Sequence, residues 1–210
     1  MEGQKPVYAD EIERLGLSGI ACTIHADGES IRVTVPIPGA HGTQCTGSDG
    51  CRQGTGTDHA GDQSRHRALE PVGGRFHIIN HGDIQIIDDC YNANPVSMKA
   101  SIDVLSNAPG RKIAVLGDMG ELGAEEKQLH YMVGEHFAGK GIDALYCVGT
   151  LSQEIAKAVR TCSSKTEVHH YEDKADLIKD LVKEVQSGDT VLVKASHFMG
   201  FPEIVKELTK

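Results

Sequence analysis

Residues 84–95 read Ile-Gln-Ile-Ile-Asp-Asp-Cys-Tyr-Asn-Ala-Asn-Pro, and this stretch predicts how the chain folds. Its first four residues form a short, mostly apolar run that is typical of a buried strand, and a polar loop follows. Asn94 offers a side chain that can cap a helix, and Pro95 suits the first helical position because its missing N–H would have no helical partner there. The stretch therefore predicts a strand, a polar loop and a helix that runs through Leu105.

The same alternation of strand and helix continues along the rest of the chain. Further apolar, strand-like runs occur at Ile113–Leu116, Ala144–Val148 and Val191–Val193, with Glu167–His170 as a weaker candidate. Amphipathic stripes at helical spacing lie between these runs, and a last one (Ile204, Val205 and Leu208) follows them. Continuous apolar strands that alternate with such helices predict βαβ units, so we expect an α/β fold with a mostly parallel sheet and helices on both faces.

The N-terminal part of the chain, to about Val72, has a different pattern. Ile20–Ile24 and Ile31–Ile37 flank the dipeptide Asp27-Gly28, which favours a hairpin turn. We see no helical stripe in this part, and its apolar residues suffice only for the small core of a hairpin. It therefore resembles the β-rich end of a larger domain, and we expect the main folding unit to span residues 73–210.

Residues 42–67 contain no Val, Ile, Leu, Met, Phe, Tyr or Trp. Such a segment buries too little apolar area to offset about 1–2 kcal/mol of backbone entropy per residue, which predicts disorder. A second interpretation is that the segment is read out of frame, because codons shifted by one base are compatible with an amphipathic helix pair. Its Cys and His residues lack the spacing of a zinc site, so we expect no metal there.

Composition and charge exclude several classes of protein. The 210 residues carry a formal net charge of −9, which argues against a general binder of nucleic acids or membrane surfaces. No apolar run approaches the roughly 20 residues that a membrane span needs, and no signal peptide is recognisable. The six cysteines do not form a disulfide framework. We therefore expect a cytoplasmic protein with no membrane span and no nucleic-acid partner.

Polar residues gather where the predicted strands end, which is the edge at which open parallel sheets bind ligands. Asp88 and Asp89 end the first strand, either as a strand stop with helix capping or, for Asp89, as a carboxylate that contacts ribose hydroxyls or a metal-bound nucleotide. Tyr91 and Asn92 have no evident structural role and are better candidates for ligand contact.

Four more residues are candidate substrate contacts from their strand-end positions alone: Asp118, Glu121, Lys194 and Ser196. For Asp118 and Glu121, a solvated or helix-capping pair remains an open interpretation. Lys194 can equally be a strand-end lysine that extends its apolar stem along the protein and its ammonium group into water. We assign no catalytic residue and no metal ligand. The chain also lacks the sequence G-x-x-x-x-G-K-[ST] of a phosphate-binding P-loop.

Four segments, Gly73–Arg75, Ile86–Met98, Ala114–Gly123 and Val191–Ser196, resemble the Mur ligase family, in particular its members that add D-alanyl-D-alanine during peptidoglycan synthesis (the MurF family). Pro38–His41 is similar to the end of that family's central ATPase domain. The resemblance implies that residues 1–72 are a remnant of the ATPase domain. It also implies that residues 73–210 are the Rossmann-like C-terminal domain, which closes over the nucleotide as a lid.

The family resemblance implies an ATP-dependent ligase that also uses Mg²⁺. In that family ATP phosphorylates the carboxylate of UDP-MurNAc-tripeptide, and the amine of D-Ala-D-Ala then attacks the acyl phosphate. By position, Arg75 and Asp89 correspond to the pair that contacts the nucleotide, with Tyr91 and Asn92 beside them. Arginine suits phosphate oxygens, and closure of the lid would keep water from the acyl phosphate.

Two departures from the family limit this expectation. The first domain and the P-loop half of the second are absent from the sequence, so we expect that this chain alone does not turn over. If residues 42–67 are out of frame, the family's adenine-side asparagine, expected near position 44, is also lost. Two alternatives stay open: a sibling Mur ligase or folylpolyglutamate synthetase, and a non-catalytic Rossmann-like module that binds a nucleotide or a partner.

Overall fold

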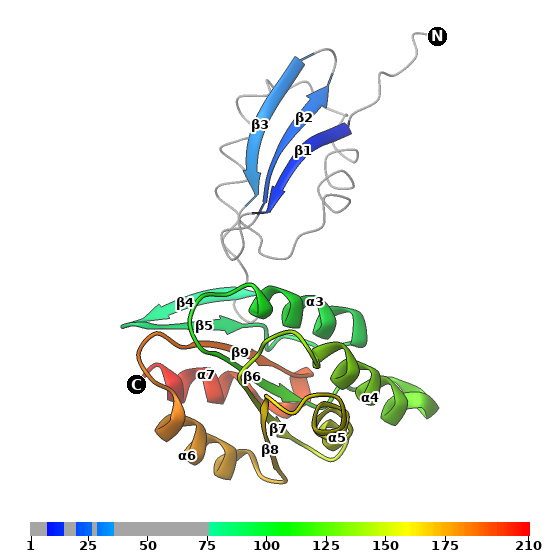
Figure 1. The fold of residues 1–210 in the computed structure, drawn as a ribbon, viewed down its shortest axis with the longest axis vertical. Helices are drawn as coiled ribbons and strands as arrows, with labels where there is room; N and C mark the ends of the chain where they lie inside the picture. The colour runs from blue at the N-terminus through cyan, green and yellow to red at the C-terminus, as the bar shows by residue number, and fades with distance from the viewer. Residues whose placement is uncertain (1–7, 15–19, 27–28, 36–75) are drawn as a thin grey trace. The chain divides into compact units, whose positions relative to one another are not determined.

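The computed structural model describes residues 8–14, 20–26, 29–35 and 76–210. The chain divides into two compact units, Met1–Glu70 and Pro71–Lys210. Figure 1 shows a small sheet in the first unit and a sheet with helices in the second.

Three antiparallel strands form the described part of the first unit: β1 (Tyr8–Arg14), β2 (Ile20–Ala26) and β3 (Glu29–Val35). β2 and β3 pair from Ile20↔Val35 to Ala26↔Glu29, so the predicted hairpin around residues 27–28 is confirmed. β1 was not predicted, because its sequence is rich in exposed charged side chains and lacks apolar alternation. Residues 42–67, with the predicted disorder or frame shift, lie outside the described residues.

The second unit contains a six-stranded sheet in the order β4-β5-β9-β6-β7-β8. Only β4 (His77–His81) is antiparallel to its neighbour, and the other four pairings are parallel. The parallel strands are β5 (Ile84–Asp88), β6 (Lys112–Gly117), β7 (Ala144–Val148), β8 (Glu167–Tyr171) and β9 (Thr190–Lys194). The predicted mostly parallel α/β fold is therefore confirmed.

Helices cover both faces of this sheet (Figure 1). On one face α3 (Pro95–Ser106), α4 (Glu126–Phe137) and α5 (Ser152–Cys162) pack side by side. On the other face lie α6 (Lys174–Glu184) and α7 (Pro202–Leu208). As predicted, Asn94 and Pro95 begin α3: the Asn94 side chain accepts the Ser97 N–H, and the Ser97 hydroxyl accepts the Asn94 N–H, which is a capping box.

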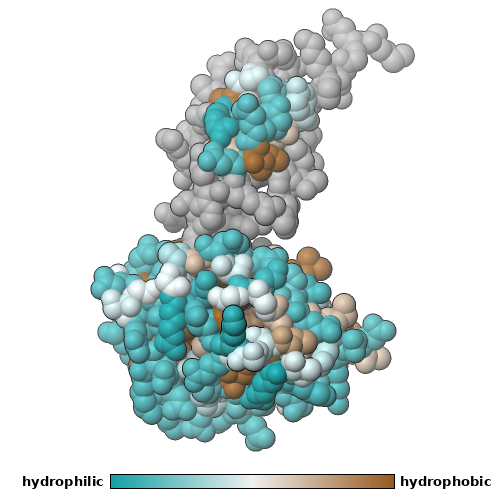
Figure 2. Space-filling view, viewed as in Figure 1, coloured by the Kyte–Doolittle hydropathy of each residue, from teal (hydrophilic) through white to brown (hydrophobic). Residues whose placement is uncertain are grey.

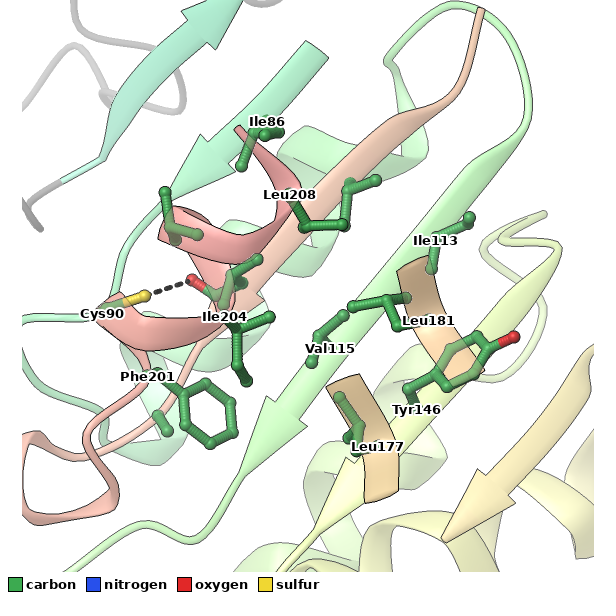
Figure 3. Close-up of a cluster of buried hydrophobic side chains, with 14 of the residues drawn as sticks. Ile86, Cys90, Ile113, Val115, Tyr146, Leu177, Leu181, Phe201, Ile204 and Leu208 are labelled. Carbon is green, nitrogen blue, oxygen red and sulfur yellow. Dashed lines mark hydrogen bonds between the residues drawn. The ribbon is translucent and has the colours of Figure 1, made fainter. Parts of the chain in front are cut away.

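The core between the sheet and the α6–α7 layer is shown in Figure 3. Ile113, Val115 and Tyr146 from the strands meet Leu181 of α6 and Phe201 of the segment before α7, and all five are at most 1% exposed. Full burial of an aliphatic or aromatic side chain of this kind stabilises a fold by about 1.5–3 kcal/mol. The packing of this layer therefore stabilises the sheet whose strand ends carry the polar residues.

The surface of the second unit carries few large apolar groups. On the face shown in Figure 2 most of its atoms belong to hydrophilic residues, and the apolar ones form small patches. The most exposed large apolar side chains are Val96 and Phe198, at 80% and 68%. Among the described residues, no helix is long and apolar enough to span a membrane.

Candidate functional site

The strand order brings three polar loops together at one edge of the sheet. β9 lies between β5 and β6, so the segments that follow these strands become neighbours. We call residues 88–94, 117–122 and 194–200 the carboxyl edge. The chain leaves β5 and β6 toward helices on one face and leaves β9 toward α7 on the other (Figure 1). Such a reversal is where open α/β sheets bind ligands.

Asp89 is the most connected side chain of the carboxyl edge. Its Oδ1 accepts the Phe76 N–H at 3.2 Å, and its Oδ2 accepts the Ser101 hydroxyl at 2.7 Å and the Lys194 ammonium at 2.5 Å. Each carboxylate oxygen accepts about two hydrogen bonds. Among the described residues, two donors therefore occupy Oδ2 and one donor is bonded to Oδ1, on a side chain that is 14% exposed.

Lys194 lies at the end of β9 with its side chain 1% exposed. Its ammonium donates to Asp89 and to the Asn92 carbonyl oxygen, the latter at 3.0 Å. Two of its three N–H groups are thus bonded to the loop that follows β5. The lysine that was a candidate substrate contact is, in this structure, buried against another candidate residue.

Tyr91 and Asn92 stand on the outer side of the same loop. The Tyr91 ring is 46% exposed and lies 6.3 Å from the His197 ring, measured between centroids. The Asn92 side chain is exposed, and its oxygen accepts the Ala93 N–H at 2.8 Å. These two residues therefore present the planar groups that a ligand can reach. Arg75 lies outside the described residues; the next residue, Phe76, has a left-handed backbone with φ of 51°.

Ser196 joins the three segments of the carboxyl edge. Its hydroxyl accepts the Gly120 N–H at 2.8 Å and donates to the Ala93 carbonyl at 3.4 Å, and the side chain is buried. A side chain could not be added at Gly120 without approaching the exposed Phe198 ring to 3.0 Å. The hydroxyl of Ser196 therefore serves the packing of the loops.

Asp118 has a structural position that the sequence indicated only in part. The side chain is buried, and its Oδ1 accepts the N–H groups of Leu151 at 3.1 Å and Ser152 at 2.7 Å. Leu151 is the N-cap residue of α5 and Ser152 is its first helical residue, and neither N–H has a partner within the helix. Helix capping was an open interpretation, but the capped helix follows β7 rather than β6. Glu121, by contrast, is exposed at the tip of its loop.

Two buried residues that support the edge were not singled out from the sequence. Ser101 reaches Asp89 from α3, and His130 reaches the edge from α4. His130 is fully buried; its Nε2 accepts the Met119 N–H at 2.9 Å, so its Nδ1 carries the proton and donates to the Glu126 carbonyl at 2.7 Å. The only signal in the sequence was a polar residue on the apolar face of each helix.

The cysteine of the carboxyl edge is not a nucleophile. Burial raises the pKa of the Cys90 thiol well above its usual range, and the nearby Asp88 and Asp89 raise it further. The thiol donates to the Val193 carbonyl at 3.4 Å, as Figure 3 shows. Within the described residues, no group of three or more His, Cys, Asp or Glu side chains could hold a metal ion. The described residues of the carboxyl edge thus offer polar contacts to a ligand.

The sequence is similar to that of known ligases. The model of the Mur ligase glutamate ligase domain matches residues 74–197. The UDP-N-acetylmuramoyl-tripeptide–D-alanyl-D-alanine ligase of Escherichia coli (strain K12) is 35% identical over 195 residues, which are 90% of this chain and 42% of the relative. The ligase of the same name from Bacillus subtilis (strain 168) is 38% identical over 143 residues, 67% of this chain and 31% of the relative.

Solved structures show the same similarity. A crystal structure of MurF from Acinetobacter baumannii has a TM-score of 0.87 and 27% identity, and the match covers 99% of this chain and 46% of that one. A MurF ligase from Thermotoga maritima in complex with ADP has a TM-score of 0.71 and 26% identity over 98% of this chain and 45% of that one. The chain thus spans less than half of these relatives. A folylpolyglutamate synthase from T. maritima, at 11% identity and a TM-score of 0.62, shares the fold alone.

Proposed function

The chain belongs to the Mur ligase family, and from this membership we propose that it is the lid-forming part of a cytoplasmic ligase that joins D-Ala-D-Ala to UDP-MurNAc-tripeptide. In this proposal residues 73–210 are the C-terminal domain and residues 1–72 are the end of the central ATPase domain. The observation that carries it is the carboxyl edge, where Lys194 bonds to Asp89 and Asn92 and Ser196 bonds to the loop after β6, in a chain 35% identical to a ligase of that name.

The nucleotide side of the proposed site is formed by the loop after β5. The described residues fit a nucleoside: Oδ1 of Asp89 accepts one hydrogen bond among them and can accept another from a ribose hydroxyl, and the half-exposed Tyr91 ring in the same loop offers a flat apolar surface. Arg75 would supply a cation for the phosphates. ATP supplies the phosphoryl group that activates the carboxylate of the tripeptide. The described residues contain no cluster that fits Mg²⁺, and we assign it no step.

On the acceptor side, the structure separates the four candidate substrate contacts. Asp118, Lys194 and Ser196 are buried and bonded within the protein, whereas Glu121 is exposed. A carboxylate at this place can accept hydrogen bonds from the ammonium group of D-Ala-D-Ala and hold the dipeptide in place; the group attacks as the neutral amine after it has lost a proton. We therefore propose Glu121 as the dipeptide contact, with the other three residues shaping the surface around it.

The chain alone is proposed not to turn over, since it contains no P-loop sequence. Calorimetric titration of the 210-residue chain with D-Ala-D-Ala and with ATP tests the proposal, with L-Ala-L-Ala as the stereochemical control. We expect heat with the D-dipeptide and a loss of that heat in Glu121→Gln. ATP-dependent ligation by the purified chain would overturn the claim of inactivity. Absence of binding to both ligands at millimolar concentration would favour the alternative of a module that only binds a partner.

A further inference from the structure

Lys194 is a buried cation that the proposed function does not use directly. Its side chain is 1% exposed in the central strand of the sheet, where an isolated ammonium group is strongly unfavourable. An apolar residue at this position would avoid that penalty, because well-packed apolar replacements of buried ion pairs are often neutral or stabilising. Stability therefore does not explain why a lysine occupies this position, which indicates a functional role.

Hydrogen bonds that do not involve Lys194 already join the loop after β5 to β9 and to the segment that follows β9. The Asp89 N–H donates to the Val193 carbonyl at 3.0 Å, and the Ala93 carbonyl accepts the Ser196 hydroxyl at 3.4 Å. These bonds place the backbone of the loop. The lysine adds two contacts of a different kind, to the carboxylate of Asp89 and to the carbonyl of Asn92.

These contacts fix which oxygen of the carboxylate faces outward. Lys194 and Ser101 together occupy both acceptor positions of Oδ2. Oδ1 is consequently held toward the Phe76 N–H, and the residues that the structure describes give it no second donor. The ammonium also balances the negative charge of Asp89, which would otherwise repel the phosphates of a nucleotide.

We propose that Lys194 is a positioning residue for nucleotide binding: it orients Asp89 so that only Oδ1 is offered to a ribose hydroxyl, and it holds the Tyr91–Asn92 segment beside it. The inference rests on the proposed function for the identity of the ligand. The orientation of the carboxylate, in contrast, is a property of the protein without ligand, and it can be measured separately.

Amide hydrogen exchange tests the orientation in the 210-residue chain. In Lys194→Met we expect the Phe76 amide to exchange about tenfold faster or more, because it loses a charge-assisted hydrogen bond. The Asp89 amide, which is bonded to Val193, is the internal control and should keep its protection. A folded variant whose Phe76 amide remains fully protected would overturn the inference. If Lys194→Met does not fold, Lys194→Gln, which keeps a donor but lacks the charge and the reach, is measured at the same two amides.

A double-mutant cycle tests the link to the ligand, with ATP and 2′,3′-dideoxy-ATP as probes followed by NMR shifts. Lys194→Met should weaken ATP binding about tenfold or more and dideoxy-ATP binding much less, because only the ribose hydroxyls meet Asp89. It should have no further effect in an Asp89→Asn background. Equal losses for both nucleotides, or additive losses in the cycle, would contradict a role through Asp89. If the wild-type chain binds neither nucleotide, the nucleotide side of the proposed function fails, while the exchange result still decides whether Lys194 orients Asp89.

Discussion

Replacement of Asp118 by alanine removes the acceptor of two N–H groups at the start of α5, the part-buried one of Leu151 and the buried one of Ser152. Hydrogen bonds to a charged group contribute about 1.5–3 kcal/mol, and loss of a helix cap costs about 0.5–2 kcal/mol. The two ranges describe the same contact and are not added, so we expect Asp118→Ala to lower the free energy of unfolding by about 2–3 kcal/mol. For a domain of this size that corresponds to a fall in Tm of about 5–10 °C.

Asp118→Asn separates the acceptor from the charge. The amide oxygen can take the place of Oδ1, so only the attraction between the carboxylate and the positive end of α5 is lost, about 0.3–1 kcal/mol. Guanidinium unfolding followed by far-ultraviolet circular dichroism measures both variants. Glu121→Ala, on the exposed part of the same loop, is the matched control and should stay within about 0.5 kcal/mol of the wild type. The reasoning is refuted if the asparagine variant is as unstable as the alanine variant, or if the alanine variant is as stable as the control.

Three further predictions follow from local contacts of the second unit. Asn94→Ala should lose about 1 kcal/mol of stability with the capping box of α3, whereas Asn94→Asp should stay within a few tenths in the same denaturation assay; equal losses would contradict the capping role. Burial raises the pKa of the Cys90 and Cys147 thiols above their usual range, whereas Cys162 is exposed. Iodoacetamide should therefore label Cys162 before either buried thiol, as measured by peptide mapping. Early labelling of Cys90 or Cys147 would contradict this packing. Partial burial alone would raise the pKa of Asp103, but hydrogen bonds from Lys140 and His136 hold it below its ordinary value of 3.8. The ionised Asp103 therefore stabilises the fold above pH 3.8, and this contribution is lost as the pH falls through the lower folded-state pKa. Near pH ~5, Asp103→Asn should be less stable than the wild type by under about 1 kcal/mol. A difference in stability between the two proteins that persists in strong acid would count against the ion pair.

Apolar periodicity predicted the elements that bury a face. The strands β5, β6, β7 and β9 and the helices α3 to α7 each carry buried side chains, and their spacing shows in the sequence. The edge strand β8, whose side chains are at most partly buried, gave only the weaker signal. β1 and β4 were missed because both pair with only one described neighbour and carry few buried side chains, so no alternation marks them. Within α4 the apolar Met132 is 39% exposed, while the polar His130 is fully buried. A polar side chain with two backbone partners can replace an apolar one in a core, and no periodicity reports such partners.

The carboxyl edge was predictable as a place but not as a set of contacts. Strand ends could be read from the sequence, and parallel strands put those ends on one side. The pairing of Lys194 with Asp89, and of Asp118 with α5, depends on which strands are neighbours. Alternation of strands and helices fixes that strands are parallel but does not fix their order. Of the residues selected for nucleotide contact, Arg75 remains a prediction, since it lies outside the described residues.

The central place of β9 has a consequence for how the second unit folds. β9 is the last strand to be synthesised, yet β5 and β6 are each hydrogen-bonded to it and not to each other. Until β9 is made, the sheet exists only as two pieces, the β4–β5 hairpin and the β6–β7–β8 segment, each with an open inner edge. Such late closure over a long sequence separation slows folding and leaves strand edges open to pairing with other chains. A nascent chain that stops before β9 therefore holds all the other strands of the sheet and still lacks the one that joins them.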